Sequence, residues 1–156
     1  MGFVMDDIDR DLVEALRANA RSTYAELGRL VGLSPPAAHE RVAKLEATGI
    51  IAGYHASVEP VALGLGVSAL VGVLISDDHE AEDVVAALRD LPEIEDCWFV
   101  AGEETFVIKV RVPDVDSLEK TLGALRRISG VSRTRTTVVL STRWENKVRS
   151  VRGCPG

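Results

Sequence analysis

Polar side chains crowd a short stretch that opens with a serine and two prolines, SPPAAHERVAK, at residues 34–44. The imidazole of His39 and the carboxylate of Glu40 can exchange hydrogen bonds with base edges, and a carboxylate accepts from cytosine N4. The cations of Arg41 and Lys44 suit phosphate oxygens instead. These residue types on one helix predict a helix that reads DNA in a groove. The expected base-reading residues are Pro36, Ala37, His39 and Glu40, and the expected phosphate contacts are Ser34, Arg41 and Lys44.

Arg41 has an alternative role. Its guanidinium could form an ion pair within its own domain rather than meet DNA. Lys44 is therefore ranked above Arg41 as the phosphate contact, and Lys44→Ala should weaken binding to all sequences alike.

A second polar group lies in the loop AGEE, ahead of a strongly alternating segment. A free amino acid carries an ammonium and a carboxylate on one carbon, so its site needs acceptors and donors close together. Glu103 or Glu104 could meet the ammonium, and Gly102 allows close backbone approach or a positive φ. Thr134 and Thr136 share one side of a later strand and add hydroxyls. The alternative is a plain hairpin whose glutamates are solvated.

Two short helices joined by a tight turn are predicted to position the first group. Thr23 and Glu26 have the spacing of a capping box, and Gly32 lets the chain leave the helix in a left-handed turn. Ser34 can cap the next helix, and Pro35 suits its first position. This pattern is typical of a helix-turn-helix. The residues expected to face inward are Leu27, Leu30, Val31, Ala38, Val42 and Leu45.

A further helix from Asp6 to Ala18 completes a three-helix bundle of the winged helix-turn-helix type. Its inner stripe consists of Ile8, Leu12, Ala15 and Leu16. The weak alternation and β-branched residues between Ile50 and Val58 predict a strand that leads out of the bundle. Residues 59–66 contain one proline and two glycines, which predicts a hinge.

The second half predicts a ferredoxin-like domain in the order βαββαβ, so the whole chain is of the α+β class. Val67 to Ile75 is an almost unbroken apolar run, typical of a buried central strand. Thr105 to Val112 alternates, with Lys109 and Arg111 directed outward. The other expected elements are a helix through Arg89 capped by Asp77 or Asp78, a strand from Ile94 to Val100, a helix opened by Asp116 with Glu119, and a strand from Val131 to Leu140.

A sheet with helices on one side leaves its other face bare. Val71, Val73, Val107 and Val139 are expected on that bare face. Contiguous exposed apolar residues mark interfaces, so two subunits should pair face to face.

Composition narrows the function classes. The net charge is −6, which disfavours a protein that coats DNA through overall positive charge. No apolar run reaches the roughly 18 residues of a membrane span, and the N-terminus lacks a secretory pattern. Cys97 and Cys154 show no metal or redox spacing, and Cys97 is expected to be buried. A cytoplasmic protein in a reducing compartment fits best.

An enzyme is disfavoured on the same residues. The three histidines, His39, His55 and His79, do not converge on one predicted site. No phosphate-binding loop or hydrolase motif occurs. No metal or cofactor site is therefore expected.

The stretch from Leu27 to Gly64 resembles the DNA-binding half of the Lrp/AsnC (feast/famine) transcriptional regulators. The matching residues are Val31-Gly32-Leu33-Ser34, Arg41-Val42, Leu45-Glu46, Gly49-Ile50-Ile51, Gly53-Tyr54 and Leu63-Gly64. The second half resembles the effector-binding domain of the same regulators to about Thr142. Its marks are Val100-Ala101-Gly102-Glu103, Gly130-Val131 and the strand with Thr134, Thr136 and Val138.

The resemblance implies a sequence-specific DNA-binding transcriptional regulator of double-stranded DNA, cytoplasmic and associated with the nucleoid. It implies an amino acid or similar metabolite bound between subunits, and dimers that assemble into an octamer. Thr105 replaces an acidic residue common in the family, so the effector's identity stays open, and Glu40 stands where a basic residue is frequent. The implied domains are a helix-turn-helix at 1–52, a linking strand and hinge at 53–66, an effector-binding and oligomerisation domain at 67–142, and a basic tail at 143–156.

Two alternatives remain. Some sirohaem decarboxylases share the two-domain fold, but His79 is the only histidine in this chain's second half. A DNA architectural protein without a ligand is disfavoured by the acidic net charge.

Overall fold

The computed structural model describes residues 4–146, so the part of the expected basic tail (143–156) from residue 147 onward lies outside the described residues. The described chain divides into two compact units. One runs to Ser57 and includes residues 144–146, and the other spans Val58–Arg143. Each unit has its own hydrophobic core and is described by itself.

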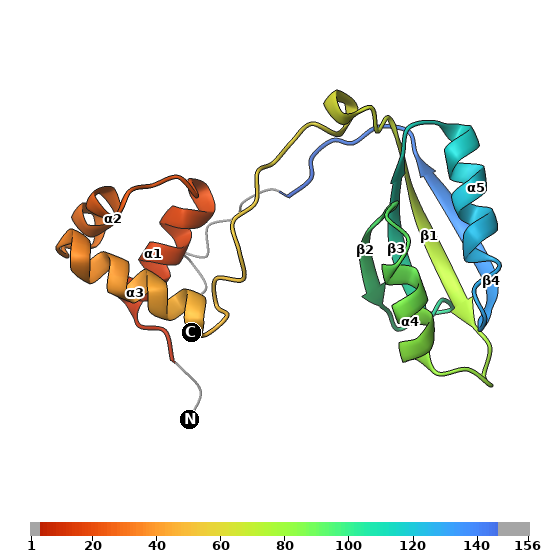
Figure 1. Cartoon of the computed structure of the whole chain (residues 1–156), viewed down its shortest axis with the longest axis horizontal. Coiled ribbons are helices and arrows are strands. Elements are labelled where there is room, and N and C mark those ends of the chain that lie inside the picture. Colours follow the sequence, from red (N-terminus) through yellow and green to blue (C-terminus); the bar gives the residue numbers. More distant parts are fainter. Residues whose placement is uncertain (1–3, 147–156) are drawn as a thin grey trace. The chain divides into compact units, whose positions relative to one another are not determined.

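The first unit is a three-helix bundle (Figure 1). Its helices are α1 (Asp7–Ala18), α2 (Tyr24–Val31) and α3 (Pro35–Ala47). The predicted capping box is confirmed, because the Glu26 amide donates to Thr23 Oγ1 while the Thr23 amide donates to Glu26 Oε2. Gly32 ends α2 at a φ of 72°, as the sequence predicted. The core consists of Leu12, Leu16, Leu27, Ala38 and Val42.

Two predictions for this unit are wrong. Leu30 is 60% exposed, because the inner side of the eight-residue α2 is taken by Leu27 and Gly28. Residues 50–58 form no strand, and within the described part of this unit no other strand is present to pair with them. An extended segment needs a neighbour to satisfy its backbone groups. The helix-turn-helix is thus present, and the strand predicted to lead out of it is irregular backbone.

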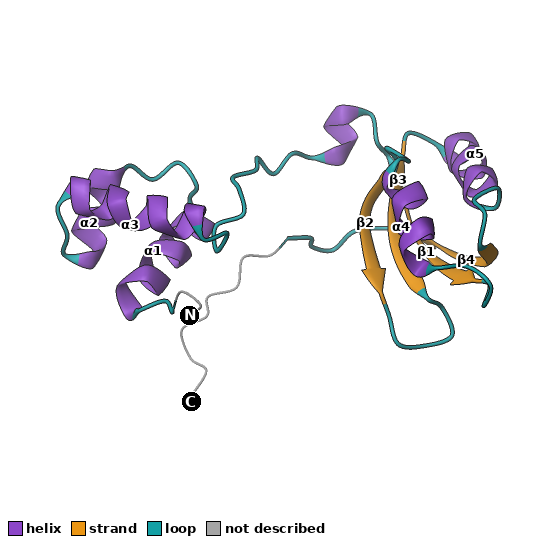
Figure 2. Cartoon of the chain, turned by 60° about the horizontal axis from the view of Figure 1, so that its bottom comes forward, coloured by secondary structure: helices purple, strands orange, loops and turns teal. Residues whose placement is uncertain are grey.

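The second unit is a four-stranded antiparallel sheet with two helices on one face (Figure 2). A single 3-10 turn, η1 (Pro60–Leu63), precedes it in the predicted hinge. The strand order is β2-β3-β1-β4, the ferredoxin-like order that the sequence predicted. The elements are β1 (Val67–Ile75), α4 (Ala81–Arg89), β2 (Ile94–Phe99), β3 (Phe106–Val112), α5 (Val115–Leu125) and β4 (Val131–Val139).

Two of the four residues predicted on the open face of the sheet, Val107 and Val139, lie there, and the other two do not. Val71 and Val73 are fully buried, because they pair with Ile108 and Phe106 and so point to the helix-covered side. An unbroken apolar strand does not reveal by its pattern which alternate residues face the helices. Leu70 and Trp98 join Val107 and Val139 on the open face, since all four alternate with the buried set.

Three smaller predictions for this unit, on two helix caps and on Cys97, are also wrong, whereas the outward direction of Arg111 is confirmed. Asp114, not Asp116, caps α5, since its carboxylate accepts from the Ser117 amide at 2.7 Å. Glu80 precedes α4 without a side-chain cap, so neither Asp77 nor Asp78 caps it. Arg111 faces the predicted side, but its side chain is only 7% exposed. Its Nε donates a hydrogen bond to Glu95 Oε1 at 2.8 Å. Cys97 is exposed because β2 is an edge strand.

Candidate functional site

Helix α3 presents an exposed polar ridge. It starts where Ser34 Oγ accepts from the Ala37 amide at 3.4 Å. Pro36, Glu40 and Lys44 recur every fourth residue and are all exposed, so they line one side of the helix. The opposite side is buried in the core through Ala38, Val42 and Leu45. The structure thus brings most of the predicted DNA-contacting residues to one accessible surface, and Ala37 is half-buried at its margin.

His39 is exposed and lies against a residue that the sequence did not single out. Its imidazole meets the ring of Tyr24 edge-on, with centroids 4.6 Å apart and planes at 76°. Edge-to-face pairs of this kind hold the two rings in a defined orientation. The start of α2 therefore orients a side chain on the recognition helix.

Arg41 does not join this ridge through its charged group. Its Nη1 donates to Asp6 Oδ2 at 2.7 Å and to Asp9 Oδ1 at 2.8 Å. The Asp9 amide hydrogen bond and then the Arg41 guanidinium hold the pKa of Asp6 below its usual value. The structure realises the alternative role, an ion pair within its own domain.

The turn between α2 and α3 depends on Gly28, which the sequence analysis missed. A Cβ at this position would lie 2.5 Å from the Leu33 carbonyl oxygen, closer than real Cβ atoms come. The Gly28 carbonyl itself accepts from the Leu33 amide at 2.8 Å. Only glycine at position 28 lets the turn pass this close to α2. Gly28 lies inside a helix, where no sequence pattern indicates such a contact.

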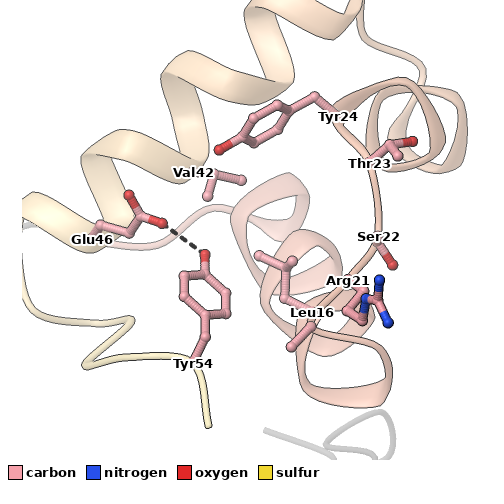
Figure 3. A pocket seen from close by; sticks show the side chains of 9 residues that line it. Leu16, Arg21, Ser22, Thr23, Tyr24, Val42, Glu46 and Tyr54 are labelled. Atoms are coloured by element: carbon pink, nitrogen blue, oxygen red, sulfur yellow. Dashed lines mark hydrogen bonds between the residues drawn. The ribbon is translucent and has the colours of Figure 1, made fainter. Parts of the chain in front are cut away.

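A pocket of about 430 Å³ opens on the same unit, between the end of α1, the start of α2 and the second half of α3 (Figure 3). Tyr54 points into it from the irregular segment after α3 (Figure 3). Its phenol donates to Glu46 Oε1 at 2.7 Å. Burial, followed by this hydrogen bond, raises the pKa of Tyr54 to about 12. The bond holds the segment after α3 against the recognition helix.

Tyr54→Phe should remove a contribution to the stability of the first unit that the wild type loses at alkaline pH. The raised pKa means that the folded unit favours the protonated phenol, so this contribution is present below about pH 10, the ordinary tyrosine pKa, and is lost towards pH 12. Denaturant midpoints measured at pH 8 and pH 11.5 should fall less in the variant than in the wild type. Tyr24→Phe, at the other tyrosine lining the pocket, is the control and should keep the wild-type loss.

In the second unit, the loop between β2 and β3 forms an ion-pair cluster. Arg135 on β4 donates through Nη2 to Glu103 and through Nη1 to Glu104, the latter at 3.0 Å. The hydrogen bond from Arg135 holds the pKa of Glu103 below its usual value. Glu104 lies flat over Gly72 on the open face, where an added Cβ would meet its Cγ at 2.5 Å. Both glutamates are therefore ion-paired with Arg135, and the Glu103 side chain stays largely exposed.

The other predicted effector residues are placed differently. Thr134 and Thr136 pair with Val73 and Val71, so they point to the helix-covered side, away from Arg135. Thr105 donates its amide to the Val73 carbonyl at 2.9 Å, and its hydroxyl accepts from the Ile75 amide at 3.4 Å. The structure does not bring the threonines of β4 together with the loop.

Gly102 does not have the positive φ that the sequence allowed. A Cβ there would meet no atom within 4 Å. Its lack of a side chain leaves open space above the loop instead, where a bound molecule or another subunit can approach the backbone closely.

Family models match both units of the chain. The AsnC-type helix-turn-helix domain matches residues 5–46, and the Lrp/AsnC ligand binding domain matches residues 68–148. Within residues 4–146 no helix has the length and apolar character needed to cross a membrane.

Similar proteins extend along almost the whole chain. The HTH-type transcriptional regulator LrpA of Mycobacterium tuberculosis is 40% identical over 147 residues, which are 94% of this chain and 97% of LrpA. Regulatory protein AsnC of Escherichia coli K12 is 33% identical over 139 residues, 88% of this chain and 91% of AsnC. The solved structure of the M. tuberculosis feast or famine regulatory protein complexed with L-methionine is 39% identical, covers 94% of this chain and 99% of that one, and has a TM-score of 0.88. With both units matched and in the family's order, the chain belongs to the Lrp/AsnC family of DNA-binding transcriptional regulators.

Proposed function

We propose that this regulator reads a specific DNA sequence through the exposed ridge of α3 and responds to an amino acid held at the loop between β2 and β3. The observation that carries the proposal is the ridge formed by Pro36, Glu40 and Lys44, which stands opposite the buried side of α3. A helix exposed in this way after a tight turn suits the major groove. Such a regulator acts on DNA in the cytoplasm, at the nucleoid.

Within the ridge, Glu40 and Lys44 have separable roles. The Glu40 carboxylate accepts hydrogen bonds and repels phosphate, so it suits a base edge such as cytosine N4. The Lys44 ammonium suits a phosphate, which is present at every sequence. Base readout and backbone attraction thus come from residues one turn apart on the same helix.

Glu40→Gln should change which sequences are selected from a random duplex pool, with little loss of affinity for random DNA. Lys44→Ala should weaken binding to every duplex and reduce the slope of log affinity against log salt by about one for each phosphate that is no longer neutralised. Fluorescence anisotropy across a salt series measures both quantities. Unchanged affinity and slope for Lys44→Ala would contradict the proposed docking.

The effector site rests on the charges of the loop cluster. A free amino acid is a zwitterion, and the cluster offers both counterparts: Glu103 and Glu104 for an ammonium, and Arg135 for a carboxylate. Binding would break the ion pairs within the cluster and form new ones with the ligand. The affinity therefore reflects only the difference in free energy between the new pairs and the broken ones. We therefore expect modest affinity, about −4 to −8 kcal/mol. The complex of the similar M. tuberculosis regulator with L-methionine supports an amino acid as ligand.

We further propose that subunits pair through the open face of the sheet. Leu70 and Trp98 are 40% and 46% exposed there, an apolar surface that a partner sheet could cover. The open space above Gly102 then suits a ligand seated between subunits, and the family resemblance favours four dimers in a ring. Ligand binding at such a junction is linked to assembly in both directions.

Calorimetry with all twenty amino acids should give heat for at least one of them, with L-methionine the first to try. Arg135→Met should abolish that heat, since it removes the charge and keeps the side chain long. Gly102→Val should abolish it too, without unfolding the loop, because a Cβ added at this position meets no atom within 4 Å.

The control for the charge is Arg126→Met, at an exposed arginine that caps the end of α5. It should leave the heat unchanged. Light scattering on the same samples should show assemblies larger than a monomer. Binding that survives Arg135→Met and Gly102→Val would move the site elsewhere in the chain.

A further inference from the structure

Arg41 carries one of the few positive charges on α3, yet its guanidinium is held by the first turn of α1. We propose that Arg41 is a positioning residue, which fixes the rotation of the recognition helix against α1, and that it does not contact DNA phosphate. This inference rests on the proposed DNA-binding role of α3. It changes the role expected for Arg41 from the sequence.

The contact joins two helices far apart in the sequence. One nitrogen, Arg41 Nη1, bridges carboxylates that stand 35 and 32 residues away. Asp6 and Asp9 also hold each other in place. The Asp9 carboxylate accepts a hydrogen bond from the Asp6 amide at 3.2 Å, and the Asp6 carboxylate accepts one from the Asp9 amide at 2.8 Å. Arg41 is thus bound to a rigid cap rather than to two mobile side chains.

Burial makes the contact costly to break. Asp9 is only 4% exposed. A buried carboxylate deprived of its cationic partner keeps its desolvation cost without compensation. The pair therefore favours one arrangement of α3 against α1, and it adds a directional contact to the apolar core that the two helices share.

Charge also argues against a phosphate contact. One guanidinium faces two carboxylates, so the cluster of Arg41, Asp6 and Asp9 has a formal net charge of −1. A phosphate that approaches Arg41 would meet this negative charge, and Nη1 already donates to both carboxylates. Base reading, in contrast, needs its side chains within about 0.5 Å of their productive positions. A rigid link between α1 and α3 meets that need.

The first test is a double-mutant cycle that needs no DNA. Arg41→Met, Asp9→Asn and the double variant are compared with the wild type by denaturant unfolding. The shift in midpoint for the double variant should be clearly smaller than the sum of the two single shifts, since either change alone already breaks the pair. Additive shifts would show that the pair does not link the helices in solution, and would overturn the inference.

The second test measures DNA reading at a temperature where circular dichroism shows each variant fully folded. The probes are a duplex selected from a random pool by the wild-type chain and a random duplex of the same length. Arg41→Met should lower the ratio of the two affinities about tenfold or more, while the affinity for random DNA and its salt slope stay at wild-type values. Lys44→Met is the matched control: it should weaken both complexes and flatten the slope.

Arg41→Lys separates the remaining explanations. An ammonium can replace a guanidinium at a phosphate, but it stands on a flexible stem and is more strongly hydrated, so it should hold Asp6 and Asp9 less firmly than Arg41 Nη1 does. We expect Arg41→Lys to recover only part of the discrimination that Arg41→Met removes. Full recovery, or a flattened salt slope in Arg41→Met, would assign Arg41 to phosphate and overturn the inference. A wild-type chain that fails to discriminate between DNA sequences would instead refute the proposed function, whereas equal discrimination by wild type and Arg41→Met would refute this inference alone.

Discussion

Leu27→Ala should destabilise the first unit by about 2–5 kcal/mol, the usual cost of truncating a fully buried leucine. Leu27 is 1% exposed and packs against the side chains that α1 and α3 bury. A whole domain is commonly stable by only about 5–15 kcal/mol. A loss of this size should therefore lower the population of folded helix-turn-helix and DNA binding together. Urea unfolding followed by circular dichroism measures the loss.

The same helix supplies a matched control. Leu30 lies three residues further along α2 but is 60% exposed. Leu30→Ala should change the free energy of unfolding by no more than about 0.5 kcal/mol, as is usual at exposed positions. Similar losses at both leucines would mean that α2 packs differently from the structure.

Gly28→Ala should destabilise the first unit although it raises helix propensity. At an unconstrained helical position, replacing glycine by alanine stabilises by up to about 1 kcal/mol. Here the new Cβ would lie 2.5 Å from the Leu33 carbonyl oxygen, and this backbone atom cannot swing aside. Overpacking of this kind costs typically about 1–3 kcal/mol, so the net effect is a loss. Weaker DNA binding should follow because the turn that sets α3 must shift.

Gly123→Ala is the control for this prediction. Gly123 also lies inside a helix, but its added Cβ would meet only Arg127 Nη1, at an ordinary 3.6 Å. The same substitution should therefore stabilise the second unit by about 0.5–1 kcal/mol. Opposite signs for the two glycines in chemical denaturation would confirm the close approach at Gly28; a gain at both would contradict it.

Local rules predicted the helix-turn-helix well. The Thr23–Glu26 capping box, the left-handed Gly32 and the Ser34 cap each depend on residues within three positions of one another. The alternation of β3 likewise gave the residues that face the core. These features are encoded in short stretches, and the structure confirms each of them.

The failures concern contacts between segments distant in sequence. Arg135 was missed as a member of the loop cluster because its contact depends on the register of β4 against β1, which no local pattern reveals. The ion pair of Arg41 spans more than thirty residues and could only be offered as an alternative. The pattern at 50–58 suggested a strand, but tertiary context decides whether a partner strand exists.

The close fit of Glu104 over Gly72 constrains how the family can diverge at this site. Any side chain added at position 72 must take the space of the Glu104 stem. A larger residue there becomes acceptable once Glu104 has been shortened or has turned away, and that change also removes one of the two carboxylate partners of Arg135. Positions 72 and 104 should therefore change together among relatives. A relative in which both residues differ would also carry a different charge in the loop between β2 and β3.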